Sequence, residues 1–144
     1  MKRDLKTHLN KKMIYLDTNI FVIAVLEGGK AKEILNKLVD KNIQAFTSII
    51  TWDEFVWAIK KATLDYDFAK KEGEKFLFLP NLRFLDINFD VIKKAQDLIE
   101  DYNLNPRDSI HVATAVLKGI REIISDDPDL DKAKEIKRVS IINF

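Results

Sequence analysis

Short apolar runs alternate along the chain with segments that have helical periodicity. Apolar runs at 13–16, 44–47, 83–87, 122–125 and 138–142 are predicted to be strands. The first run, MIYL, is apolar at every position, as in a parallel strand buried on both faces. Helices are predicted at 19–27, 31–39, about 51–62, 65–78, 91–102 and 105–117. Strands separated by helices favour a parallel sheet with right-handed crossovers, so we expect a three-layer α/β domain.

The chain is long enough for one packed domain, because its 144 residues are 47% hydrophobic. We expect residues 13–144 to form that domain and residues 1–12, MKRDLKTHLNKK, to be a basic extension. No apolar run reaches the roughly 18 residues of a membrane span. Asp17 also interrupts the apolar run that a secretion signal would need. These features predict a cytoplasmic protein that does not contact a membrane.

The composition excludes several kinds of chemistry. The chain has no cysteine and only two histidines, which excludes thiol catalysis, iron–sulfur clusters and the usual zinc sites. Its four glycines form neither of the common glycine-rich phosphate-binding motifs. With 24 basic and 23 acidic side chains the formal net charge is +1. Any binding of a nucleic acid must therefore depend on a local surface.

Acidic residues are predicted to gather at one edge of the sheet. Asp17 ends the first predicted strand, and Asp126 and Asp127 follow the fourth. Glu54 and Asp108 lie in the first turns of predicted helices. In open α/β sheets, ligands bind beyond the carboxyl ends of the strands, where the strand order reverses. Four carboxylates could therefore meet in one crevice.

Each acid also has a purely structural explanation. Asp17 and Asp127 could cap helices, and Asp108 lies where the helix dipole favours an acid. The motif Thr51-x-x-Glu54 fits a capping box. Caps do not require the acids to share one edge of the sheet, however. Carboxylates that converge without basic residues repel one another, and a divalent cation commonly neutralises them. Oxygen ligands without Cys or His favour Mg²⁺ or Mn²⁺.

Four segments resemble the signatures of PIN-domain ribonucleases in order and spacing. They are Y-L-D-T-N at 15–19, S-I-I-T-W-D-E-F at 48–55, R-D-S-I-H-V-A-T-A at 107–115 and I-S-D-D-P-D-L-D at 124–131. The resemblance implies a five-stranded parallel sheet in the order 3-2-1-4-5 and Mg²⁺- or Mn²⁺-dependent hydrolysis of RNA. It also implies that Asp17, Glu54, Asp108 and Asp127 are the catalytic acids.

The resemblance assigns further roles within this site. A metal held by Asp17, Asp108 and Asp127 would activate water for attack on the phosphodiester. Glu54 would be either a ligand or an acceptor that orients water. Asn19 and Ser125 match the supporting polar residues of the family.

The chain departs from the family pattern near its fourth motif. Asp126 stands where a neutral residue is common, so it could compete with Asp127 as a ligand. Leu130 replaces the usual aromatic residue after Asp129, which leaves the role of Asp129 open. Arg107 could bind a substrate phosphate or could simply be a solvated residue.

Two neighbours of the acids are interpreted as structural. His111 follows Asp108 by one helical turn and is interpreted as a packing residue rather than a catalytic one. Asp53 should point about 100° away from Glu54 around the helix, into solvent.

The stretch FVWAI at 55–59 is apolar on every side, which indicates either deep burial or a protein interface. Many relatives of this length are VapC-type toxins, which form homodimers and are inhibited by a small antitoxin. We therefore expect RNA as substrate, an antitoxin as a possible partner, and a homodimer that Trp57→Glu weakens. A stand-alone RNA-processing nuclease and an inert RNA- or protein-binding scaffold are the alternatives. A phosphatase of the haloacid-dehalogenase kind would need D-x-D, but the chain has D-T-N at 17–19.

Overall fold

The computed structural model describes residues 11–38 and 42–144. Its strands are β1 (Lys12–Leu16), β2 (Ile43–Ser48), β3 (Leu82–Leu85), β4 (Glu122–Ile124) and β5 (Lys137–Val139). Its α-helices are α2 (Thr18–Leu26), α3 (Gly29–Lys37), α4 (Ile50–Thr63), α5 (Tyr66–Leu77), α6 (Phe89–Tyr102) and α7 (Pro106–Leu117). Two short 3₁₀ helices follow, η1 (Pro128–Lys132) and η2 (Ile141–Asn143). All strands pair in parallel in the order β3-β2-β1-β4-β5, which confirms the predicted fold class and strand order.

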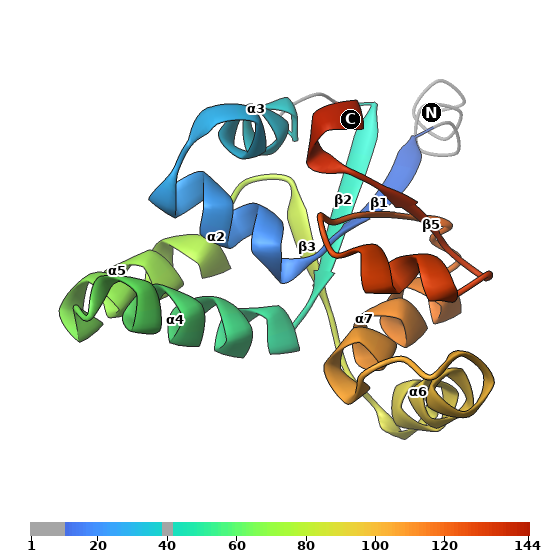
Figure 1. Ribbon diagram of the computed structural model, residues 1–144. Helices are drawn as coiled ribbons and strands as arrows, with labels where there is room; N and C mark the ends of the chain where they lie inside the picture. The colour runs from blue at the N-terminus through green and yellow to red at the C-terminus, as the bar shows by residue number, and fades with distance from the viewer. Residues whose placement is uncertain (1–10, 39–41) are drawn as a thin grey trace, which may run out of the picture.

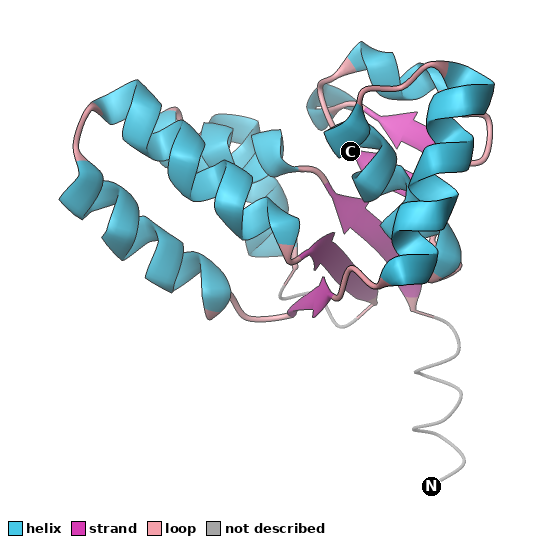
Figure 2. Cartoon of the chain, turned by 90° about the horizontal axis from the view of Figure 1, so that it is seen from below, coloured by secondary structure: helices cyan, strands magenta, loops and turns pink. Residues whose placement is uncertain are grey.

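Helices cover both faces of the sheet (Figures 1 and 2). On one face, α2, α3, α4 and α5 form a hydrophobic cluster with Ile14 and Leu16 of β1. On the other face, α6 and α7 form a second cluster with Tyr15. All three of these β1 residues are inaccessible to solvent. Because β1 is the central strand and faces a helical layer on each side, its sequence must be apolar at successive positions.

The last predicted strand is too long. It was expected at 138–142, but β5 ends at Val139, and Ile141 belongs to η2. The Ile141 N–H donates to Asp126 Oδ1 (3.1 Å), so this backbone group binds a side chain instead of a neighbouring strand. The third and fourth strands also end earlier than predicted, at Leu85 and Ile124.

The predicted capping box at the start of α4 does not form. The cap position is Ile49, which has no side-chain hydrogen bond to the helix. The Thr51 hydroxyl instead bonds the Thr47 hydroxyl of β2 (2.7 Å), beneath the helix. The Glu54 carboxylate contacts His111 of α7. Glu54 is therefore free of a capping role.

The predicted basic extension lies mostly outside the described residues. Lys12, the last residue assigned to it, is the first residue of β1. Among the helices at 11–38 and 42–144, none is long and apolar enough to cross a membrane.

Candidate active site

The first and last predicted acids follow neighbouring strands. Asp17 comes directly after β1, and Asp127 comes shortly after β4. These strands pair in parallel with Leu16 opposite Ile124, and the Asp17 N–H donates to the Ile124 carbonyl (3.1 Å). Since β1 pairs with β2 on its other side, the strand order reverses here. Both acids lie where a ligand site of an open α/β sheet is expected.

The buried Ser125 hydroxyl joins three of the predicted site residues. It donates to Asp17 Oδ2 (2.6 Å) and accepts from Asn19 Nδ2 (3.1 Å) and from the Asp127 N–H (3.0 Å). The other oxygen of Asp17 accepts from the Thr18 N–H (2.8 Å), so Asp17 also caps α2. The prediction that Asp17 caps a helix is thus correct, and the same carboxylate also lies in the candidate site.

The helical acids meet the strand-end acids in one crevice. Glu54 projects from α4 and Asp108 from the first turn of α7, so each helical layer contributes one acid. The crevice has a volume of about 340 Å³, and the residues that line it are Asp17, Thr18, Asn19, Val22, Glu54, Trp57, Ala58, Arg107, Asp108 and Asp127. All four predicted catalytic acids therefore lie together.

His111 is a site residue that the sequence interpretation missed. It is buried, as a packing residue would be, but both ring nitrogens bind side chains. Nε2 lies 2.5 Å from Glu54 Oε1 and 3.7 Å from Asp17 Oδ1, and Nδ1 lies 2.6 Å from the Tyr15 hydroxyl. A chain of hydrogen bonds from Tyr15 through His111 to Glu54 thus fixes the orientation of the Glu54 carboxylate. His111 is buried as a packing residue would be, and the structure adds these two side-chain bonds, which the sequence did not predict.

The electrostatic balance of the site favours protonation of His111. Burial alone would lower the pKa of this imidazole. The hydrogen bond to Glu54 and the charges of Asp17, Glu54 and Asp108 raise it more, and the net shift is upward. A protonated His111 offsets part of the negative charge of the crevice.

The neighbouring acids Asp126 and Asp127 point to different places. Asp126 is exposed and accepts the Ile141 N–H, whereas Asp127 lines the crevice. Asp129 lies beside Asp127, because its N–H donates to Asp127 Oδ1 (3.0 Å). One oxygen each of Asp108, Asp127 and Asp129 lies within 4.8 Å of the others. Asp129 therefore belongs to the acidic cluster, and Asp126 does not reach it.

Two further predicted positions have simple outcomes. Arg107 is exposed and lines the crevice, so its guanidinium is available to a bound anion. Asp53 is exposed, as expected from its position on α4.

Asp108 is the acid whose protonation the crevice changes most clearly. Burial, followed by the charges of Asp127, Asp17 and Glu54, raises the pKa of Asp108 from 3.8 to about 6, although His111 opposes the shift. Without a cation, Asp108 of the folded protein therefore keeps its proton up to about pH 6, whereas Asp108 of the unfolded chain loses it near pH 4.

This shift predicts a pH dependence of stability. Between about pH 4 and 6 the folded state binds more protons than the unfolded state, so the free energy of unfolding of the metal-free protein should fall as the pH rises. Solvent screening of a half-buried carboxylate limits this effect to about 1 kcal/mol. Asp108→Asn should remove the effect, so urea unfolding in EDTA should show the variant gaining about 1 kcal/mol relative to wild type from pH 4 to 7. A difference that does not change with pH would contradict the assignment.

The donor atoms of the crevice fit a hard divalent cation. The carboxylates of Asp17, Asp108, Asp127 and Asp129 offer only oxygen atoms, which suit Mg²⁺ or Mn²⁺. Asn19 Oδ1 is buried and has no hydrogen-bond partner in the described part of the chain, so the crevice contains an unpaired oxygen acceptor. Asp17 is not part of the tight group formed by the other three acids, and each of its oxygens accepts one hydrogen bond, which leaves a lone pair on each for a cation.

The structure is a three-layer α/β domain in which carboxylates gather at the point where the strand order of the parallel sheet reverses. A family model of the PIN domain matches residues 14–136, and the chain belongs to this family. The chain is 27% identical to ribonuclease VapC2 of Methanocaldococcus jannaschii over 96% of its own length and 99% of that protein. It is 22% identical to ribonuclease VapC6 of the same organism, over 86% and 94% of the two chains.

The fold also matches solved structures. One chain of a toxin–antitoxin complex from Klebsiella pneumoniae superposes with a TM-score of 0.66 and 24% identity, covering 86% of this chain and 95% of that chain. At this level of identity the match shows a shared fold.

Proposed function

We propose that this protein is an endoribonuclease that requires Mg²⁺ or Mn²⁺, and that it is the toxin of a type II toxin–antitoxin pair. The observation that carries the proposal is the meeting of Asp17, Glu54, Asp108 and Asp127 in one crevice. Two relatives that align along nearly their whole length are named ribonucleases, which supports RNA as the substrate. Such a protein would act in the cytoplasm.

The residues of the crevice have distinct roles in this proposal. Asp17, Asp108 and Asp127 would hold the cation, with Asp129 beside them. When bound, the cation would neutralise phosphate oxygens and make water easier to deprotonate. His111 and Tyr15 hold the Glu54 carboxylate in place, so that it can orient a water molecule at the phosphodiester. Arg107 can hold a phosphate at the rim of the crevice.

Two protein partners belong to the proposal. The first is a small antitoxin, which the similarity to a chain of a toxin–antitoxin complex supports. The second is another copy of this chain. The stretch at 55–59 cannot provide the whole contact, because Phe55 and Ile59 are buried and only Trp57 is mostly exposed, at 58%. A stable interface buries about 800 Å² per partner, so the contact with a second copy must be formed mainly by other exposed apolar residues.

A cleavage assay tests the proposed function. Purified protein should cut single-stranded RNA in the presence of Mn²⁺ or Mg²⁺, and excess EDTA should stop the reaction. Cleavage that persists in EDTA would contradict the metal requirement. Tight Mn²⁺ binding without cleavage of any RNA would favour the inert scaffold instead.

A further inference from the structure

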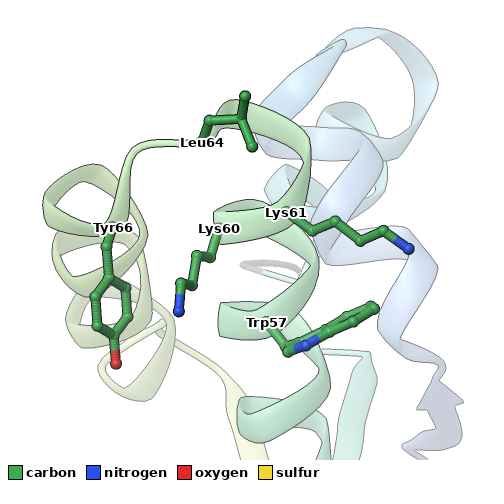
Figure 3. Close-up of a pocket in the computed structure, with 5 residues that line it drawn as sticks. All are labelled: Trp57, Lys60, Lys61, Leu64 and Tyr66. Carbon is green, nitrogen blue, oxygen red and sulfur yellow. The ribbon is translucent and has the colours of Figure 1, made fainter.

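A second depression lies next to the crevice on the α4–α5 hairpin. Its volume is about 460 Å³, and the residues that line it are Trp57, Lys60, Lys61, Leu64 and Tyr66 (Figure 3). We refer to these five residues as the aromatic–lysine surface. Trp57 lines both this depression and the acidic crevice, so the two adjoin at this side chain.

The aromatic rings of this surface are exposed and lie close to cations. Trp57 is 58% exposed and Tyr66 is 49% exposed. Lys61 Nζ lies 4.8 Å from the Trp57 ring centroid, and Lys60 Nζ lies 4.4 Å from that of Tyr66. Figure 3 shows Trp57 and Lys61 extending side by side from α4, while Lys60 points toward Tyr66 on α5. Exposed aromatic rings beside lysines are typical of surfaces that bind single-stranded nucleic acid, because bases stack on the rings and phosphates pair with the cations.

The aromatic–lysine surface carries positive charge beside the negatively charged crevice. The carboxylates of the crevice repel a phosphodiester backbone. Across residues 11–38 and 42–144, neither Lys60 nor Lys61 forms an ion pair with an acid. Two uncompensated lysines next to an acidic crevice therefore provide a local attraction for RNA on a chain whose net charge is only +1.

The spacing along α4 connects the two regions. Glu54, Trp57 and Lys61 are separated by three and four residues, which places them on one face of the helix. Glu54 and Lys61 are about 10 Å apart along the helix axis. That distance corresponds to about three stacked nucleotides.

We propose that the aromatic–lysine surface binds the single-stranded segment of RNA next to the phosphodiester in the crevice. Bases stack on Trp57 and Tyr66, and Lys60 and Lys61 hold the flanking phosphates. This inference rests on the proposed function, and it names a binding surface outside the acidic cluster.

A second copy of the chain is a poorer occupant of this surface. A two-fold contact would bring the same patch of both copies together. Lys60 and Lys61 of both copies would then be buried in one interface, and such a concentration of like charges is unfavourable. An anionic partner has no such cost.

Binding of a short fluorescein-labelled single-stranded RNA of mixed sequence tests the proposal. The measurement is made by anisotropy in EDTA, so that the strand stays intact. Trp57→Ala should weaken binding by about tenfold, because one base loses its stacking partner. For an abasic strand of equal charge, Trp57→Ala should have no effect. The double variant Lys60→Ala/Lys61→Ala should lower the slope of log Kd against log salt by about 1.4, since each phosphate contact contributes about 0.7.

Matched controls lie elsewhere on the molecule. Phe78→Ala removes another exposed ring, which is 79% exposed and follows the end of α5. The double variant Lys32→Ala/Lys37→Ala removes the same charge from exposed positions of α3. Neither control should measurably change RNA affinity, because none of these residues lines the aromatic–lysine surface.

The outcomes separate this inference from the proposed function. If wild type cleaves RNA but the Trp57 and lysine variants bind it as wild type does, the surface is not an RNA site and the proposed function stands. If wild type neither binds nor cleaves RNA, both fail. Light scattering provides a further check: a homodimer that becomes monomeric on Trp57→Ala, with unchanged RNA affinity, would assign the surface to a second copy and overturn the proposal.

Discussion

Asp17→Asn is expected to lower metal-dependent RNA cleavage by about a thousandfold, equivalent to about 4 kcal/mol of transition-state stabilisation. The substitution removes one charge from the crevice and keeps the size of the side chain. Asn caps helices about as well as Asp, so α2 should still begin at Thr18. If Asp17 acted only as a cap, cleavage would stay near the wild-type rate. A single-turnover assay with excess enzyme measures the difference.

The same variant should respond less to added cations. Binding to the folded state stabilises wild type in proportion to the logarithm of the metal concentration, and the variant should lose most of that gain. From the sequence alone, relief of carboxylate repulsion would stabilise the metal-free variant by about 1 kcal/mol. The structure opposes that gain, because Asp17 Oδ2 accepts a hydrogen bond from Ser125 that an amide nitrogen cannot accept. We therefore expect little net change of the melting temperature in EDTA and a clearly smaller upward shift with Mn²⁺.

Asp127→Asn should also strongly reduce cleavage, and Asp126→Asn provides its control. Asp127 lines the crevice, and its loss should reduce the rate by about a thousandfold. Asp126 is exposed and accepts the Ile141 N–H, a hydrogen bond that an Asn side-chain oxygen can also accept. Asp126→Asn should therefore cleave at close to the wild-type rate, because this side chain does not line the crevice. The opposite order of activities would assign the ligand role to Asp126.

The fold and the placement of the acids follow from local sequence signals. A run that is apolar at every position, such as residues 13–16 of β1, is typical of a central strand that is buried on both faces of a parallel sheet. Asp17 then marks the carboxyl end of that strand, where a switch point binds ligands. Patterns of this kind predict which residues lie at the same edge, and the crevice contains all four predicted acids. Their catalytic roles remain predictions until the variants are measured.

Side-chain partners from distant segments are what the sequence could not predict. The capping motif Thr51-x-x-Glu54 is a correct local signal, but Glu54 contacts His111 at a separation of 57 residues. The bond between His111 and Tyr15 spans 96 residues. Helical periodicity places His111 on the same face as Asp108, yet it carries no information on which side chain of another element meets it. Such contacts depend on tertiary packing, which overrides local preference.

The long separation between Asp17 and Asp127 has a consequence for protein synthesis. The central strand β1 is made first, but its neighbour β4 and the last acid of the crevice follow about 110 residues later. At a translation rate of about 5–20 residues per second, that interval lasts about 5–20 seconds. Until β4 pairs with β1, Ser125 and Asp127 cannot reach Asp17, and a partial chain has an incomplete crevice. Until residues 122–127 have been made, the nascent chain therefore carries only three of the four acids that line the crevice.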